Sequence, residues 1–327
     1  MSEILIRPPL TPDRPFPPAE TPTMYFIGVT THKSSIMKVF PRWAEYLGLG
    51  DVAIQGMNFQ WHDLPENYRK AVAFIREDPL SLGALVTTHK LDLLAACRDQ
   101  FDRLDEFAEL MGEISSISKD QGCLVGHAKD PITSGLALEA FLPERYWEQT
   151  GAEALVLGAG GSAIAVTWHM LKESHGANRP SRLVVTNRSL PRLEEIRRFH
   201  ERIGADIPRE YHHTPTPEAT DRILAGMRPG SLVINATGLG KDAPGSPLSD
   251  AAAWPEKGIA WDFNYRGDLV FLEQARAQQQ EKDLRIEDGW IYFLHGWTRV
   301  IAEVFHIDIP TSGPKFDEIS RIAESVR

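Results

Sequence analysis

The stretch Val156-Leu157-Gly158-Ala159-Gly160-Gly161-Ser162-Ala163 places a glycine-rich turn between the apolar residues 154–157 and an apolar segment at 164–173. A strand, such a turn and a helix in this order are typical of dinucleotide-binding units. Glycines allow the sharp turn and the close approach of a pyrophosphate, and the helix N-terminus offers free N–H groups and a positive dipole end. We therefore expect a dinucleotide to bind at this turn; a turn that serves packing alone is the alternative. The expected binding residues are Gly158, Ala159, Gly160, Gly161 and Ser162.

The end of the next predicted strand, 183–186, indicates which dinucleotide binds. It reads Thr186-Asn187-Arg188-Ser189 and lacks the carboxylate that accepts a ribose 2′-hydroxyl in NAD-binding proteins. Arg188, helped by Asn187 or Ser189, can pair with a 2′-phosphate, which favours NADP over NAD. A solvated arginine at a strand end is the alternative. Further along, Thr237 and Gly238 follow a strand at 231–235 and leave space for a ribose or nicotinamide.

Predicted strands and helices alternate on both sides of this turn, which indicates an α/β fold with a mostly parallel sheet and helices on both faces. The first half carries strands at 24–29, 52–56 and 82–87, helices at 36–49, 68–75, 91–97 and 107–111, and a hairpin of 114–118 with 123–126. A helix at 133–141, extended past Pro143, would connect to the second half. There we predict a further strand at 258–262 and helices at 190–203, 269–279 and 291–304.

Composition bounds the class of protein. The 327 residues suit two domains, and only two cysteines, Cys97 and Cys123, exclude a disulfide framework. Forty-five acidic against 35 basic residues give a formal net charge of −10, which argues against a nucleic-acid binder and a polybasic membrane anchor. Because no apolar run spans a bilayer and no secretory signal is evident, we expect a cytoplasmic protein. Residues 1–23 hold seven prolines between Pro8 and Pro22 and should be extended over a surface or disordered.

The sequence lacks the residues that several dehydrogenase mechanisms require. No tyrosine has a lysine four residues later, and the two cysteines lie in unrelated segments, so neither a Tyr/Lys pair nor a catalytic zinc is expected, and we predict no metal. Lys90, in the loop after the strand at 82–87, can exchange a proton with a carbonyl oxygen as hydride moves, and Asp130 can orient it. An ordinary surface lysine is the alternative for Lys90.

At this point the chain resembles the shikimate/quinate dehydrogenase family over residues 24–310. The order of landmarks carries the resemblance: Ile27-Gly28 with a serine-rich loop, Val86-Thr87 then Lys90, Gly112-Glu113-Ile114-Ser115, Gly126 then Asp130, the glycine turn, Asn187-Arg188-Ser189, Val233 to Thr237, Asp262 to Tyr265, and Asp288-Gly289. The resemblance implies a substrate domain at 24–140, a Rossmann-type NADP domain at 141–285, and C-terminal helices at 286–327 that return to the first domain.

The resemblance also implies roles for individual residues. Lys90 matches the family's catalytic lysine and Asp130 its partner aspartate. Thr87 matches a threonine that touches substrate, and Tyr265 a tyrosine at the domain cleft. Ser34 matches the first serine of a loop that grips the substrate carboxylate, and Ser35 can replace the second serine if the loop shifts.

The sequence departs from the family mainly in the residues that hold the substrate. Ile36 and Met37 stand where the family has its second serine and a proline, and the proline before the catalytic lysine is absent. The family's substrate-binding asparagine falls on Ser115, its Asn-Thr before the aspartate on Ala128-Lys129, and the glutamine of its closing helix on Gly296. Since unmet polar groups on a substrate weaken binding, we expect shikimate and quinate to be poor substrates unless Ser35, His89, His127 or His295 compensates.

Two functions remain open from the sequence. The first is an NADP-dependent oxidoreductase that interconverts a ring hydroxyl and ketone on a shikimate-like cyclic hydroxy acid, acting as a monomer or homodimer in aromatic amino acid biosynthesis. The second is a non-catalytic, NADP-responsive binding protein on the same fold. We also expect His212 and His213 to lie in a surface loop, and His32, His89 and His127 either to form a polar pocket or to serve their own segments.

Overall fold

The computed structural model describes residues 7–241 and 243–327, which pack as two units. Of the described residues, the first unit contains 7–129 and 294–327, and the second contains 130–241 and 243–293. The sequence predicts domain boundaries after residues 140 and 285, whereas packing divides the chain after residues 129 and 293. The difference arises because the helix at 130–141 packs along the helix that follows the glycine turn. No helix in the described parts of the chain is both long and apolar enough to cross a bilayer.

The first unit is built on a six-stranded mixed sheet with the strand order β2-β1-β3-β5-β6-β4. Its first three strands in this order run parallel, and β5 runs antiparallel to β3. Strands β5 and β6 form the hairpin that the sequence predicts within 114–126. The strands are β1 (Thr23–Gly28), β2 (Ala53–Asn58), β3 (Ser81–Val86), β4 (Arg103–Leu104), β5 (Ser116–Asp120) and β6 (Cys123–His127). All six residues of β1 are buried, which identifies a central strand covered on both faces.

Helices cover both faces of this sheet. They are η1 (Thr31–Lys33), α1 (Ile36–Leu47), α2 (Pro65–Glu77), α3 (Lys90–Cys97), η2 (Arg98–Gln100), α4 (Glu106–Met111), α12 (Trp290–Phe305) from residue 294 on, and α13 (Pro314–Glu324). Tyr25 and Ile27 share a core with residues of α2 and α3, whereas Phe26 meets Trp297 of α12 at a ring distance of 5.0 Å. Alternate side chains of one strand therefore serve two apolar layers.

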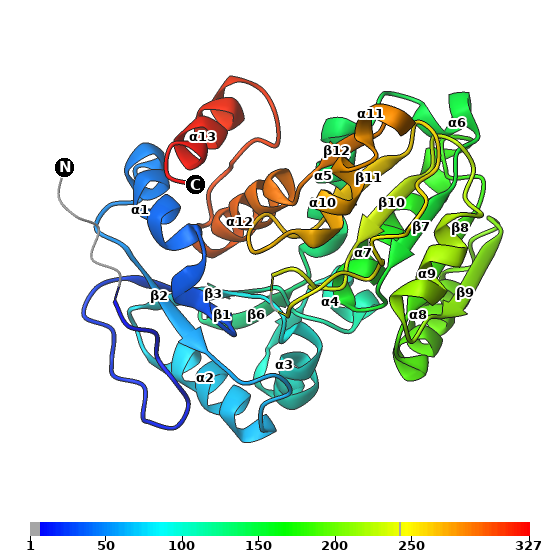
Figure 1. Cartoon of the computed structure of the whole chain (residues 1–327). Helices are drawn as coiled ribbons and strands as arrows, with labels where there is room; N and C mark the ends of the chain where they lie inside the picture. The colour runs from blue at the N-terminus through cyan, green and yellow to red at the C-terminus, as the bar shows by residue number, and fades with distance from the viewer. Residues whose placement is uncertain (1–6, 242) are drawn as a thin grey trace. The chain divides into compact units, whose positions relative to one another are not determined.

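The C-terminal residues return to the first unit, as the resemblance implies. Figure 1 shows α13, in red, beside α1, in blue, and the Trp43 indole N–H donates to the Ile319 carbonyl at 2.9 Å. At the other end of the chain, the described part of the proline-rich segment, from residue 7 on, lies over the same unit. Leu10 and Phe16 pack on its core, and the Leu10 N–H donates to the Gly56 carbonyl. The extended alternative therefore holds for these residues, while residues 1–6 lie outside the described part.

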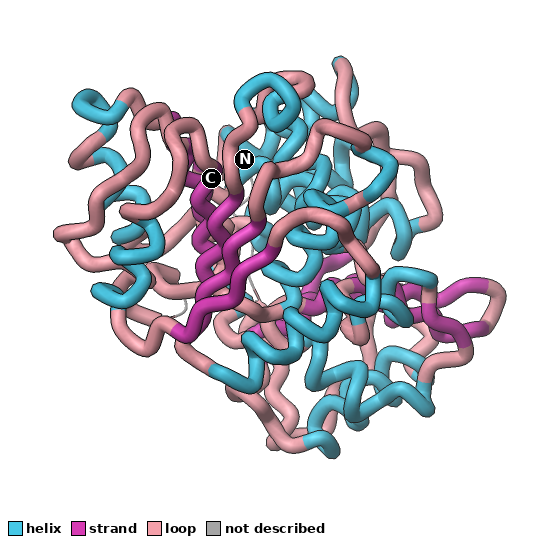
Figure 2. The backbone as a smooth tube through the Cα atoms, turned by 90° about the vertical axis from the view of Figure 1, so that its right-hand side faces the viewer, coloured by secondary structure: helices cyan, strands magenta, loops and turns pink. Residues whose placement is uncertain are grey.

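The second unit contains a six-stranded parallel sheet in the order β12-β11-β10-β7-β8-β9, the doubly wound arrangement of a Rossmann-type domain. Figure 2 shows strands as magenta tubes running side by side. The strands are β7 (Ala154–Leu157), β8 (Leu183–Asn187), β9 (Arg209–His213), β10 (Leu232–Asn235), β11 (Ile259–Asp262) and β12 (Arg285–Glu287). His212 and His213 lie on edge strand β9, so the predicted surface loop is wrong there, although His213 is exposed. Pairing with β8 overrides the weak strand pattern of this polar segment.

Helices cover this sheet on both faces as well. They are α5 (Asp130–Phe141), α6 (Tyr146–Thr150), α7 (Gly161–Leu171), η3 (Glu173–His175), α8 (Leu190–Ile203), α9 (Pro217–Leu224), α10 (Val270–Arg276) and α11 (Gln279–Lys282). Leu155 and Leu157 share a core with residues of α9 and α10, whereas Trp261 packs against Phe141 of α5 at a ring distance of 5.0 Å. Helix α5 ends at Phe141 and does not continue past Pro143 as the sequence suggested.

Candidate active site

The glycine turn of the second unit has the geometry that a dinucleotide requires. Gly158 has φ +115°, and a Cβ at this position would lie 2.7 Å from the Ala236 carbonyl oxygen, so only glycine fits. A Cβ at Gly160 would meet nothing within 4 Å, which leaves space in front of the turn. Helix α7 begins at Gly161 and no side chain caps its first turn. Its N–H groups and dipole therefore suit a phosphate.

Asn187, Arg188 and Ser189 lie together at the carboxyl end of β8, as predicted. Arg188 is exposed, and its backbone carbonyl accepts a hydrogen bond from His213 Nε2 at 3.0 Å. The Asn187 side chain donates to the Ser189 carbonyl at 3.3 Å, and Ser189 starts α8 without a capping bond from its hydroxyl. The Arg188 guanidinium therefore lies at the end of β8, next to edge strand β9. The sequence did not indicate this arrangement, because it did not predict β9.

The predicted nicotinamide loop rests on a buried polar network. The Thr237 N–H and hydroxyl both donate to Asn235 Oδ1, and Asn235 Nδ2 donates to Asp262 Oδ2 at 3.1 Å. Asn264 donates its backbone N–H to Asp262 Oδ1 at 2.8 Å and its side-chain amide to the Leu239 carbonyl. Gly238, with φ +75°, turns the loop. Burial raises the pKa of Asp262 to about 7, although these hydrogen bonds and the charge of Lys241 favour its ionised form.

Asp130 opens α5 in the second unit and is buried. Its Oδ2 accepts a hydrogen bond from the Tyr292 hydroxyl at 3.0 Å and one from the Ser162 hydroxyl at 3.4 Å. Ser162, predicted to touch the cofactor, thus also links the glycine turn to the carboxylate. The sequence missed Tyr292, because its apolar neighbours indicate a core position; the signal available was that a tyrosine hydroxyl among buried residues requires a polar partner.

Tyr265 lies in the loop after β11 and packs among aromatic rings of the second unit. Its ring centroid is 4.7 Å from that of Phe293 and 5.3 Å from that of Trp290. The side chain is half-buried. These contacts give Tyr265 a defined position on the same unit as Asp130.

Lys90 begins helix α3 in the first unit. Strand β3 ends at Val86, and Thr87 donates its N–H to the Ile27 carbonyl, so it continues the sheet by one residue. Thr88 then adopts φ +61°, and the Lys90 carbonyl accepts the Ile114 N–H at 3.2 Å. Thr87 and Lys90 are both half-buried and stand three residues apart at the carboxyl end of a central parallel strand, where ligands of open α/β sheets bind.

The serines of the expected substrate loop differ in exposure. Ser34 is buried and follows η1, and Ser35 is half-buried and precedes α1 without capping it. Ile36 and Met37, at the places of the family's second serine and proline, are 0% and 3% exposed and belong to the core. The apolar replacements therefore face away from solvent.

The other positions that differ from the family pattern also lie in the first unit. Ser115 is buried, and its Oγ accepts the Lys129 N–H at 2.7 Å. Ala128 belongs to the apolar core, and Lys129 Nζ lies 2.7 Å from Glu303 and 3.7 Å from Asp105. At Gly296 a Cβ would meet nothing within 4 Å, so the missing glutamine leaves open space on α12.

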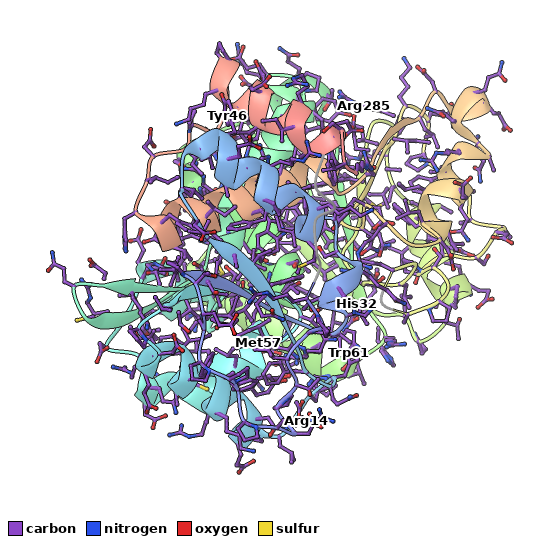
Figure 3. All side chains as sticks on the ribbon, turned by 90° about the vertical axis from the view of Figure 1, so that its left-hand side faces the viewer. Arg14, His32, Tyr46, Met57, Trp61 and Arg285 are labelled. Carbon is purple, nitrogen blue, oxygen red and sulfur yellow. The ribbon has the colours of Figure 1, made fainter. Side chains whose placement is uncertain are left out.

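The histidines have separate sets of contacts. His89 Nδ1 lies 3.0 Å from the Tyr68 hydroxyl, and burial lowers the pKa of His89. His127, on β6, lies 2.9 Å from the Ser118 hydroxyl, and His295 stacks on Phe316 at 4.6 Å. His32 is exposed on η1 (Figure 3). The pocket of three histidines therefore has no support, and His89, His127 and His295 are engaged with their own partners.

Similarity to known proteins agrees with this geometry. No protein-family model matches the chain. A curated relative, shikimate dehydrogenase (NADP(+)) of Symbiobacterium thermophilum, is 32% identical over 231 residues, or 68% of this chain and 72% of the relative.

Solved structures share the fold. Shikimate 5-dehydrogenase from Thermus thermophilus, in complex with NADP(H) and shikimate, superposes with a TM-score of 0.65 at 23% identity and covers 92% of this chain and 99% of its own. Ligand-free 5-ketofructose reductase of Gluconobacter sp. strain CHM43 gives 0.62 at 16% identity, with coverage of 94% and 99%. At these identities the structures establish the fold alone.

Two α/β units, one of them a Rossmann-type domain with a glycine turn at the end of its first strand, define the class of two-domain oxidoreductases that use a nicotinamide dinucleotide. The identity to the Symbiobacterium relative is more specific. The chain belongs to the shikimate dehydrogenase family, whose members act on CH–OH donors. The non-catalytic alternative that the sequence left open finds no support among these relatives.

Proposed function

We propose that this protein uses NADP to interconvert a ring hydroxyl and a ketone on a shikimate-like cyclic hydroxy acid. The observation that carries the proposal is the environment of Asp130, a buried carboxylate hydrogen-bonded to Tyr292 and to Ser162 of the glycine turn. The Ser162 bond links Asp130 to the turn at which the dinucleotide would bind. The name of the Symbiobacterium relative supports the same substrate class and cofactor.

The second unit fits NADP in three places. The pyrophosphate would lie on the turn from Gly158 to Ser162, at the N-terminus of α7. Asn187, Arg188 and Ser189 would hold the 2′-phosphate, the feature that favours NADP over NAD. Thr237 and Gly238 would border the nicotinamide ribose. NADP+, when bound, accepts the hydride that leaves the substrate carbon.

Lys90 and Asp130 would handle the proton. In the oxidation, the substrate O–H proton would pass to the Lys90 amine as the hydride leaves the carbon and the C=O bond forms. In the reduction, the Lys90 ammonium would return that proton to the carbonyl oxygen. Asp130, as a carboxylate, would orient Lys90 and share the hydrogen bonding around the reacting oxygen.

Tyr292 would act as a positioning residue for Asp130. Its hydroxyl donates to Oδ2, and its ring is fixed by Phe263 at a centroid distance of 4.7 Å. A hydrogen bond from a fixed donor to a carboxylate oxygen is strong and directional. Asp130 is thereby held in one rotamer.

Ser34, Ser35, Thr87, Ser115 and Tyr265 would contact the substrate. The set is poorer in amide groups than that of the family, since Ser115 and Gly296 replace an asparagine and a glutamine. A ring with fewer or differently placed polar groups therefore suits it better than shikimate or quinate. The protein would work in the cytoplasm as a monomer or homodimer, with small molecules rather than nucleic acid or membrane as partners.

The test is NADP+ reduction, followed by the absorbance of NADPH, with a panel of cyclic hydroxy acids that includes shikimate and quinate. At least one member should give turnover that depends on both substrate and enzyme. Tyr292→Phe should then lower kcat about tenfold and shift the pH profile of kcat, with NADPH binding unchanged, because one hydrogen bond to a charged group is worth about 1.5–3 kcal/mol. Absence of turnover across the panel with either nucleotide would contradict the proposed function.

A further inference from the structure

Helices α5 and α7 of the second unit run parallel and touch at both ends. At their N-termini Ser162 meets Asp130, and near their C-termini His169 Nε2 lies 3.1 Å from Glu139 Oε1. Between these contacts, a Cβ at Gly135 would lie 2.2 Å from His169 Nδ1, so the glycine makes room for the imidazole against α5. The His169 ring is therefore held with Nε2 toward Glu139.

A third metal-binding group stands at the same place. His175, on η3, has its ring centroid 4.8 Å from that of His169. One ligand atom each of Glu139, His169 and His175 lie within 4.8 Å of one another. His169 is 6% exposed, His175 half-buried and Glu139 exposed, so the cluster is anchored on its protein side and open on the other.

We propose that Glu139, His169 and His175 bind a Zn²⁺ ion that stabilises the packing of α5 on α7, with water as the fourth ligand. Two imidazoles and one carboxylate are a ligand set that Zn²⁺ uses with an open fourth position. Ligand atoms around tetrahedral zinc lie about 3.3–3.6 Å apart, because the bonds are about 2.0–2.2 Å long. The 3.1 Å separation of Glu139 and His169 is already close to that value, and His175, whose ligand atom is within 4.8 Å of the other two, would move closer when the ion binds.

The surroundings of the cluster fit this assignment. Glu139, His169 and His175 line a cavity of about 350 Å³ that also contacts Asn178, which gives an ion and its water an entry path. Lys172, the cation nearest in sequence, is placed over the Trp168 ring at 4.3 Å. If Glu139 and His169 only formed a hydrogen bond to each other, neither the nearby His175 ring nor the adjoining cavity would be needed.

Zinc at this position would join α5 and α7 at the ends opposite to Asp130 and the glycine turn. It would touch neither substrate nor NADP, so the site is separate from the proposed function. Its effect would be to fix the two helices that carry Asp130 and Ser162. The expected consequence is stability, not a step in the reaction.

The test is zinc binding by the full chain after chelator treatment, measured by competition with a chromophoric chelator and by the visible spectrum of added Co²⁺. We expect one Zn²⁺ per chain, a four-coordinate Co²⁺ spectrum and a Tm raised by zinc. Glu139→Gln and His175→Ala should each weaken zinc at least about 100-fold, since loss of a ligand costs more than loss of an outer-shell partner. Both side chains are exposed or half-buried, so both variants should fold, as circular dichroism would show.

Glu144→Gln is the matched control, because Glu144 lines the same cavity and is not in the cluster. It should bind zinc as the parent does. Zinc binding that is substoichiometric in the parent, or equally strong in Glu139→Gln and His175→Ala, would overturn the proposal.

Discussion

The glycine turn of the second unit and the proposed substrate-binding positions of the first unit differ in what builds them. At the turn, backbone geometry is decisive, through the φ of +115° at Gly158 and the open N-terminus of α7. At the substrate positions, side chains are decisive, and there Ile36 lies in the core and Ser115 is bonded to the chain before Asp130. Side-chain chemistry can change while the fold persists, which is why the glycine turn matches the family pattern and the residues proposed to bind substrate do not.

Lys90→Ala tests a residue of the first unit that matches the family pattern. Turnover should fall at least about 100-fold, the usual range for removal of a general acid–base group. NADPH affinity should stay nearly unchanged, because Lys90 belongs to the first unit and the glycine turn to the second. Steady-state kinetics and fluorescence titration of NADPH check both statements, and near-normal turnover would remove Lys90 from the mechanism.

Kinetics with shikimate and quinate test the residues of the first unit that differ from the family pattern. We expect catalytic efficiency at least about 100-fold below that of a family enzyme, because two lost hydrogen bonds cost about 2–4 kcal/mol. The histidines that could replace the lost substrate contacts already have partners in the chain: His89 bonds to Tyr68, His127 bonds to Ser118, and His295 stacks on Phe316. Efficient turnover of shikimate at micromolar concentration would show that other side chains replace the family's substrate-binding residues.

Gly296→Gln sharpens this prediction. A Cβ at position 296 enters open space, so the helix should accept glutamine and gain stability from the loss of a mid-helix glycine. If the missing glutamine limits shikimate binding, KM for shikimate should fall. Gly296→Ala, which adds the Cβ alone, is the control for stability and should leave KM unchanged.

Arg188→Ala tests the second unit. NADPH should bind about 10- to 100-fold more weakly, and NADH should be nearly unaffected, because only NADPH carries the 2′-phosphate. Isothermal titration with both nucleotides gives the two changes. Equal losses for both, or a parent enzyme that prefers NADH, would contradict the role given to the end of β8. His213→Ala is the matched control, since it removes a contact to the Arg188 backbone and leaves the guanidinium in place.

The buried Asp262 under the proposed nicotinamide loop predicts an effect on stability rather than on binding or turnover. Its pKa is raised to about 7 in the folded chain from an ordinary value of 3.8, so the folded state binds the extra proton between these pH values. Stability contributed by Asp262 should therefore fall as pH rises through this window, by at most about 1.4 kcal/mol per pH unit.

Chemical unfolding at about pH 5 and about pH 8 measures this contribution. The parent should lose up to about 2.7 kcal/mol more than Asp262→Asn between the two pH values, since the asparagine cannot titrate. Parallel losses in the two proteins would show that Asp262 is ionised throughout. The comparison with Asp262→Asn is needed because carboxylates with lowered pKa, such as Asp105, act in the opposite direction at lower pH.

The sequence by itself determined the order of the main strands and helices, the glycine turn, the strand end at Asn187 to Ser189 and the place of Lys90 soon after β3, although Lys90 begins α3 and does not lie in a loop. These depend on local patterns, namely apolar runs, glycines and the residues that directly follow a strand. The polar strand β9 escaped prediction because its pairing with β8, not its own pattern, makes it a strand.

Only the tertiary structure decided which distant residues meet. Tyr292 reaches Asp130 across 162 positions of sequence, Asn235 reaches Asp262, and Glu139 meets His169 through the packing of α5 on α7. Whether Ile36 faces the core or a ligand was likewise set by packing. Such contacts follow from how helices and strands are placed in three dimensions, and spacing along one chain carries no record of that placement.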